Sequence, residues 1–178
     1  NFQYTGILGG LGNIHLKLGN YEIAKKQFEK SAELKLKLLK EKSESYASSM
    51  SNLGSLYYYT GNFKQSFDFH QKSMKIREDI YGKFHLKTIS SYSNLGSVYY
   101  ELGNFSLSEN YFKKCIELRE KHLGKNHHLY AYSLNALGDL YLSLKRYEEA
   151  EDLIKSALRI NKKTYGENHP DYAANLLT

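Results

Sequence analysis

Histidines recur at one position in this sequence. His85, His127 and His169 are spaced 42 residues apart, and His128 adjoins the second of them. Zinc binds imidazole nitrogens at about 2.0–2.1 Å, so the ligands of one ion must lie close together. Side chains on separate repeat units do not meet this condition, and we predict no metal site. We predict instead that these histidines cap helix starts, where a polar side chain accepts a backbone N–H.

Other reactive residue types are few. Cys115 is the only cysteine, which excludes an internal disulfide and makes a reducing compartment the default interpretation. It occupies a row of small residues, which indicates a buried, inert thiol. His15 and His70 stand where sister units carry Tyr or Phe, which indicates packing. No phosphate-binding loop, nucleophile elbow or paired-carboxylate motif is present. We predict no enzyme activity, no cofactor and no small-molecule substrate, and leave open a catalytic domain elsewhere in a longer protein.

A period of 42 residues organises the elements that hold these side chains. A Leu-Gly pair occurs four times at this spacing, and Gly-Asn-aromatic follows the first three pairs. In the fourth unit Lys145-Arg146-Tyr147 takes that place. A fixed period of a few tens of residues is typical of a solenoid. The Leu-Gly pairs begin at Leu11, Leu53, Leu95 and Leu137.

Each unit is predicted to contain two helices. In the third unit, apolar and small residues over 86–102 recur at helical spacing, and Gly103 then supplies a stop signal. A second stripe follows Phe105 and ends at Gly124. The first unit has no glycine over 39–43, so we expect its second helix to run further, with Ser43 or Ser45 as the next cap.

Small residues stand in register inside the predicted helices. A mid-helix Gly costs about 1 kcal/mol relative to Ala, so four in register predict close approach between helices. Two further small rows alternate with two large rows, which predicts interlocking helix pairs. The small rows are Gly12, Gly54, Gly96, Gly138; Ala24, Ser66, Ser108, Ala150; and Ser31, Ser73, Cys115, Ala157. The large rows are Tyr21, Phe63, Phe105, Tyr147; and Phe28, His70, Phe112, Ile154.

This order of residues resembles the tetratricopeptide repeat. The 42-residue length and the linker YGENHP resemble the longer variant of kinesin light chains. The pattern is carried in the last full unit by Leu134, Leu137, Gly138, Tyr141, Tyr147, Ala150, Ile154 and Ala157. The resemblance implies an all-α fold, a right-handed superhelical solenoid of antiparallel helix pairs A and B. We expect a single array over 1–178 with units at about 5–46, 47–88, 89–130 and 131–172, then the start of another. The absence of polar caps favours a fragment of a longer protein.

In this family the A helices line a concave groove that binds peptides or partner helices. The resemblance therefore implies a groove made mainly of Ser, Asn and Tyr. Its expected residues are Asn13, Leu16, Ser51, Asn52, Ser55, Tyr58, Tyr59, Ser93, Asn94, Ser97, Tyr100, Glu101, Tyr132, Asn135, Asp139 and Leu142. For Tyr58, Tyr59 and Tyr100, ligand contact and packing against the next repeat are equally favoured.

The charge is unevenly placed. The net charge is +6, yet the A helices carry almost no charged residue, and the Lys and Arg residues fall on the B helices and linkers. The basic clamp of chaperone-tail-binding relatives is missing, because the equivalent positions are Gly9, Asn13, Asn52, Ser93 and Ser97. Asn52, Asn94 and Asn135 match the Asn part of the kinesin-light-chain site, but a basic part is not evident on the A helices. We therefore expect a neutral groove and a basic outer face.

Two functions remain open at the level of sequence. The first is a protein-interaction adaptor that binds a peptide or partner helix in the groove through Tyr contacts and Asn hydrogen bonds. The second is a structural subunit of a large assembly, cytoskeletal or ciliary, whose basic B face lies against an acidic surface such as tubulin or RNA. Other nucleic-acid binding is disfavoured. No run of about 18 apolar residues or targeting peptide is visible, so we expect no membrane insertion and a cytoplasmic location, with cytoskeletal or ciliary association as the alternative.

Overall fold

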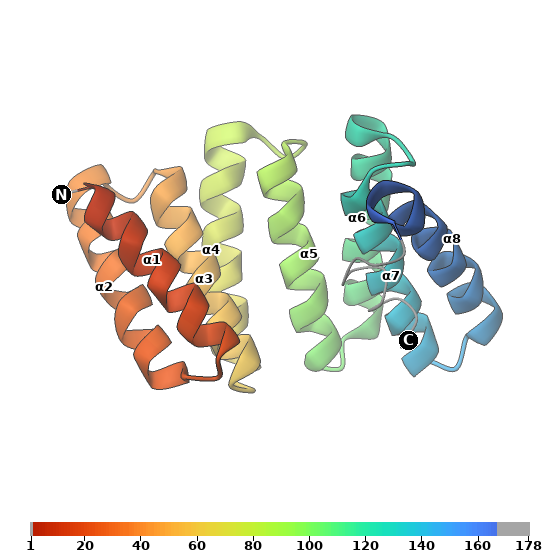
Figure 1. The fold of residues 1–178 in the computed structure, drawn as a ribbon, viewed down its shortest axis with the longest axis horizontal. Helices are drawn as coiled ribbons and strands as arrows, with labels where there is room; N and C mark the ends of the chain where they lie inside the picture. Colours follow the sequence, from red (N-terminus) through yellow and green to blue (C-terminus); the bar gives the residue numbers. More distant parts are fainter. Residues whose placement is uncertain (1, 167–178) are drawn as a thin grey trace. The chain divides into compact units, whose positions relative to one another are not determined.

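The computed structural model describes residues 2–166, and every regular element in that range is an α-helix (Figure 1). The helices alternate between 16 and 19 residues, as the two-helix units predicted. Their bounds are α1 Phe2–Lys17, α2 Tyr21–Leu39, α3 Glu44–Tyr59, α4 Phe63–Tyr81, α5 Leu86–Glu101, α6 Phe105–Leu123, α7 His128–Ser143 and α8 Tyr147–Tyr165.

The chain forms two compact units, one ending at Ser91 and the other starting at Tyr92. In the first unit, α1 pairs with α2, α3 pairs with α4, and α2 packs against α3. One apolar cluster joins these helices, with Phe28 of α2, Leu53 of α3 and Ile76 of α4 among its members. In the second unit, α7 pairs with α8 and packs against α6, around clusters that include Phe112 and Leu137. Each unit therefore has its own hydrophobic core.

Polar side chains cap the helix starts after the long linkers. Nδ1 of His127 accepts the backbone N–H of Leu129 at 3.1 Å, and Nδ1 of His85 accepts that of Lys87 at 3.2 Å. The capping role predicted for these two histidines is confirmed, since a side-chain acceptor satisfies a backbone donor that has no partner within the helix. The predicted cap at His169 lies outside the described residues.

The first B helix is no longer than the others, so our prediction of an extended helix was wrong. Helix α2 ends at Leu39, and Lys40 takes a left-handed backbone with φ of 64°. Gly82 occupies the same place after α4, with φ of 81°. The chain thus makes the turn with lysine, although a side chain disfavours this conformation. Ser43 then caps α3, where its Oγ accepts the N–H of Tyr46 at 3.3 Å.

Small and large residues interlock within each helix pair, as predicted. A Cβ added to Gly54 would lie 2.8 Å from the ring of the buried His70, and one added to Gly96 would lie 2.7 Å from Phe112. Oγ of Ser66 donates to the carbonyl of Gly54 at 2.8 Å. The second helix therefore lies close against the first because the glycines leave room for its large side chains.

The other large row does not take part in this packing, contrary to our expectation. Tyr147 is 62% exposed, and Tyr21 and Phe105 are also exposed. These side chains stand at the start of the B helices. Phe63 is partly covered by Tyr58, with ring centroids 5.7 Å apart. The row therefore forms an aromatic edge at the A–B turns and contributes little to the core.

Candidate peptide-binding face

In the first unit, the backbone of α1 at Gly9 lies close to polar side chains of α2 and α3. A Cβ added there would lie 3.8 Å from Ser31 Oγ, 3.9 Å from Asn52 Nδ2 and 4.0 Å from Lys35 Nζ. The hydroxyl, amide and ammonium groups come from α2 and α3, which converge on the bare backbone of α1. Ser31 and Lys35 are buried, and they donate to the carbonyl of Thr5 and to Ser49. Of the three groups, only the half-buried Asn52 is accessible to an extended peptide.

The other expected residues of this unit lie on α1 and α3. Asn13 is exposed, Ser51 and Ser55 are half-buried, and Leu16 packs against the apolar cluster. Helix α1 contacts α3, so these side chains belong to one neighbourhood. Leu16 is therefore part of the apolar packing. Asn13 is open to solvent, and the two serines are partly so.

In the second unit, the expected residues divide in the same way. Tyr100 and Leu142 pack against the apolar cluster around Leu137, so both are partly structural. Tyr132 is 55% exposed, and Asp139 is also exposed. The accessible contact residues here are Tyr132 and Asp139 of α7, together with the half-buried Asn94, Ser97 and Asn135 and the exposed Glu101.

Two expectations need correction. Ser93 is only 4% exposed, because the helix turns its side chain inward, so it is not available to a ligand in this structure. Asn135 was matched to Asn52 and Asn94, but it stands one residue out of that register. The 42-residue spacing instead places Ala136 with Asn52 and Asn94. The row of asparagines is therefore interrupted in the fourth 42-residue repeat.

The tyrosines contribute in different ways. Tyr59 is exposed, and Tyr58 contacts both Tyr59 and Phe63 with ring centroids 5.9 and 5.7 Å apart. Tyr100 contacts Phe105 in the same manner at 5.9 Å, besides its core contacts. Tyr100 therefore packs mainly against its neighbours in the fold, whereas Tyr59 is exposed and accessible to a partner.

Sequence reasoning missed a row of buried cations. Lys35, Arg77 and Arg119 are spaced 42 residues apart on the B helices and are almost fully buried. Each donates to a serine on the next A helix, so the cation and its acceptor recur together. The contacts are Lys35 Nζ to Ser49 Oγ at 3.1 Å, Arg77 Nη1 to Ser91 Oγ at 2.9 Å, and Arg119 Nη1 to Ser133 Oγ at 2.6 Å. The shared 42-residue spacing was the signal that could have revealed these pairs.

The buried cations of this row differ in their charged and aromatic partners. Arg77 also forms an ion pair with Glu44, with Nη2 and Oε1 3.2 Å apart. Arg119 donates to the carbonyl of Leu129 and lies over the ring of Tyr132, with its Cζ 5.7 Å from the centroid. Burial lowers the pKa of Lys35 and of Arg119, because removal from water disfavours the charged form. These three cations therefore do not belong to the outer face, where we had placed them.

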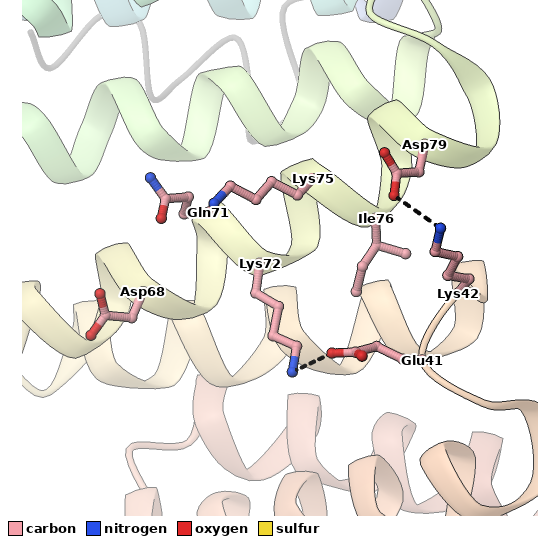
Figure 2. Close-up of a pocket in the computed structure, with 8 residues that line it drawn as sticks. All are labelled: Glu41, Lys42, Asp68, Gln71, Lys72, Lys75, Ile76 and Asp79. Atoms are coloured by element: carbon pink, nitrogen blue, oxygen red, sulfur yellow. Dashed lines mark ion pairs between the residues drawn. The ribbon is translucent and has the colours of Figure 1, made fainter.

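The outer face is less basic than expected, because carboxylates offset many of its lysines. A cavity of 370 Å³ on this side is lined by α4 and by Glu41 and Lys42 of the loop between α2 and α3 (Figure 2). At its rim Lys72 pairs with Glu41 at 2.8 Å and Lys42 with Asp79 at 3.8 Å. Hydrogen bonding to Glu41 raises the pKa of Lys72. A surface of mixed charge has little net attraction for an acidic partner.

Reactive groups are buried or dispersed. Cys115 is buried, as predicted, and burial raises the pKa of its thiol to about 11, which disfavours the reactive thiolate. Among residues 2–166, no three His, Cys, Asp or Glu side chains are grouped so as to hold a metal ion. Within the same range, no helix has the length and apolar character needed to cross a membrane.

The helices that carry the A-helix face are built from a known sequence repeat. A family model described as "Tetratricopeptide repeat" matches residues 5–79, 45–121, 88–163 and 130–178. The chain belongs to the tetratricopeptide repeat family. Its 42-residue units are therefore tetratricopeptide units, and the all-α solenoid fold inferred from the sequence is confirmed.

Solved structures support the same fold. BtubC (BKLC) from P. vanneervenii is 21% identical with a TM-score of 0.80, over 96% of this chain and 68% of the other. A protein from Podosopora anserina, described as "putative kinesin light chain nearly identical TPR-like repeats", is 18% identical with a TM-score of 0.78, over 98% of this chain and 83% of the other. The apo form of RapI is 20% identical with a TM-score of 0.75, over 97% and 60%. The likeness to kinesin-light-chain-like repeats is thus confirmed at the level of fold.

None of the curated proteins compared with this sequence matches it. At identities near 20% the solved structures establish the fold alone. What the chain binds must therefore be argued from its own residues.

Proposed function

We propose that this chain is a protein-interaction scaffold whose A-helix face binds an extended peptide or a partner helix. The exposed Asn13 and Tyr59 and the half-buried Asn52 on the A helices carry the proposal. An asparagine amide both donates and accepts, which suits a peptide backbone. Because no cofactor or reactive group is needed for such binding, the proposal assigns the segment no catalytic role.

The buried cations are not part of this ligand site. Lys35 is almost fully buried and donates to Ser49 Oγ, so it joins α2 to α3. The accessible groups on which the proposal rests are mainly neutral amide, hydroxyl and tyrosine groups.

The alternative is a structural subunit docked through the outer B face, with tubulin or RNA as the acidic surface. The removal of Lys35, Arg77 and Arg119 from that face weakens this alternative. Ion pairs such as Lys113 with Glu109, 2.7 Å apart, weaken it further. We therefore favour the A-helix face as the working surface. The cytoplasm remains the proposed location, with cytoskeletal association belonging to the alternative.

A peptide selected from a random library tests the proposal. Calorimetry would compare its affinity for the unchanged chain, for Asn52→Ala with Tyr59→Ala on α3, and for Lys113→Ala as an outer-face control. We expect the A-face variant to weaken binding at least tenfold, since each lost contact removes about 1 kcal/mol or more. The control is expected to bind as the unchanged chain does. Equal losses in both variants would refute the choice of surface.

A further inference from the structure

The A-helix face of the second unit carries two carboxylates, whereas none of the residues expected on that face in the first unit is charged. Glu101 of α5 and Asp139 of α7 are both exposed. At the 42-residue spacing, the counterparts of Asp139 in the other repeats are Asn13, Ser55 and Ser97. Asp139 therefore brings a charge to a position that is neutral in its sister repeats.

Asp139 differs from many carboxylates of the outer face because it lacks a cation. Glu33 lies 2.7 Å from Lys37, and Glu109 lies 2.7 Å from Lys113. Within the part of the chain that the structure describes, Asp139 forms no such ion pair. Its surroundings nevertheless raise the pKa of its carboxyl, because partial removal from water disfavours the charged form. A cation supplied by a ligand would give this carboxylate the partner that the fold does not provide.

The neighbours of Asp139 on α7 suit a long basic side chain. Tyr132 and Asn135 precede it by seven and four residues, so the three lie on one side of the helix. A rise of about 1.5 Å per residue separates Tyr132 from Asp139 by about 10 Å along the axis. Tyr132 is 55% exposed, and Asp139 is the one Asp, Glu, Lys or Arg residue of α7. The apolar stem of a Lys or Arg can lie along this surface while its charged end reaches Asp139.

Glu101 adds negative charge to the same neighbourhood. It is the last residue of α5, where unpaired carbonyl groups make the helix end negative and an acidic side chain is unfavourable. Lys17 holds the corresponding position at the end of α1. Tyr100, next to Glu101, packs against the apolar cluster that contains Leu137 of α7. The end of α5 thus lies near α7, and its negative potential favours a cation beside this face.

We propose that the A-helix face of the second unit binds a basic segment of its peptide ligand, with a Lys or Arg side chain paired to Asp139. This inference rests on the peptide-binding function proposed above and specifies the chemistry of the ligand. Charge complementarity favours a basic peptide here and disfavours an acidic one. Because Asp139 is partly shielded from water, its pair with the ligand is screened less by salt than a fully exposed pair.

Peptide selection against three proteins tests the proposal. A random peptide library is selected separately against the unchanged chain, against Asp139→Asn with Glu101→Gln, and against Glu117→Gln with Asp152→Asn. The last protein loses two exposed carboxylates of the B helices α6 and α8, so it controls for the change of net charge. We expect an excess of Lys and Arg over the starting library in the peptides from the unchanged chain and the control. This excess should be absent from the peptides selected by the Asp139 variant.

Calorimetry with the most frequent peptide from the unchanged chain locates the contact. We expect Asp139→Asn to weaken its binding about tenfold, since a hydrogen-bonded charge pair is lost. Replacing the paired Lys or Arg of the peptide with Gln should then cause little further loss in that variant.

Two results would overturn the inference. One is a set of peptides without an excess of Lys and Arg, and the other is the same excess from all three proteins. The proposed function would survive either result if Tyr132→Ala, or Asn52→Ala with Tyr59→Ala, still weakens binding of the selected peptide. A library that yields no binding peptide, or peptides that none of these A-face changes weakens, would overturn the inference and the proposed function together.

Discussion

At the residue scale, the 42-residue period allows each side chain to be compared with its own counterparts. His70 stands in a row with Phe28 and Phe112 and fills the same space beside a glycine. The burial of His70 therefore follows from its position in the repeat, and burial disfavours protonation of its imidazole ring. Burial, with a smaller effect of Arg77, lowers the pKa of His70 from 6.5 to about 4.

This shift makes stability depend on pH. Between pH 6.5 and about pH 4 the unfolded chain binds a proton at His70 and the folded chain does not. The free energy of unfolding therefore falls as the pH is lowered through this window, by roughly 3 kcal/mol at most. His70→Phe should remove this part of the loss, because phenylalanine fits the sister sites. Urea unfolding at both ends of the window would show it, and parallel losses in the two proteins would contradict it.

Two lysines hold a backbone conformation that glycine holds elsewhere. Lys40 and Lys145 have φ of 64° and 60°, where the corresponding units carry Gly82 and Gly103. A side chain in this region costs about 1–2 kcal/mol. We expect Lys40→Gly and Lys145→Gly each to stabilise the protein by about 1 kcal/mol in denaturant unfolding, while Gly82→Ala destabilises it. A loss of stability in both lysine variants would show that their side chains matter more than the backbone.

At the scale of the element, two glycines of α1 separate helix propensity from packing. Gly10 has no atom within 4 Å of an added Cβ, whereas an added Cβ on Gly12 would meet the ring of Phe28 in a hard overlap. Gly10→Ala should therefore stabilise the protein by up to about 1 kcal/mol, since alanine favours the helix. Gly12→Ala should destabilise it by about 1–3 kcal/mol through overpacking. Thermal unfolding of both variants would test this. A change of stability in the same direction in the two variants would contradict the interlocking of α1 with α2.

The sequence predicted the helices better than it predicted the contacts that side chains make between helices. Periodic apolar residues and stop glycines located the helix pairs, because both signals are local. The end of α2 was misjudged because Lys40 makes a turn that composition assigns to glycine. The contacts of Lys35, Arg77 and Arg119 were missed because they cross from one repeat to the next. A period reveals which residues correspond, but not on which side of a helix a long side chain ends.

At the scale of the whole molecule, the distribution of charge favours one surface over the other. The outer face carries lysines that carboxylates largely offset, such as Lys30 and Lys37 around Glu33. Exposed pairs of this kind are screened by salt and contribute little to binding. The A-helix face instead offers mainly neutral amide, hydroxyl and tyrosine groups. Binding there should persist at high salt, while binding through the outer face should be lost.

The most direct test of the account is the capture of a native partner from lysate at low and at high salt. The unchanged chain would be compared with Asn52→Ala with Tyr59→Ala, two changes on helix α3 of the A-helix face. We predict a partner that is retained by the unchanged chain at both salt concentrations and lost by the variant at both. A partner that leaves the unchanged chain at high salt, and binds the variant equally well at low salt, would contradict the account and identify the outer face as the working surface.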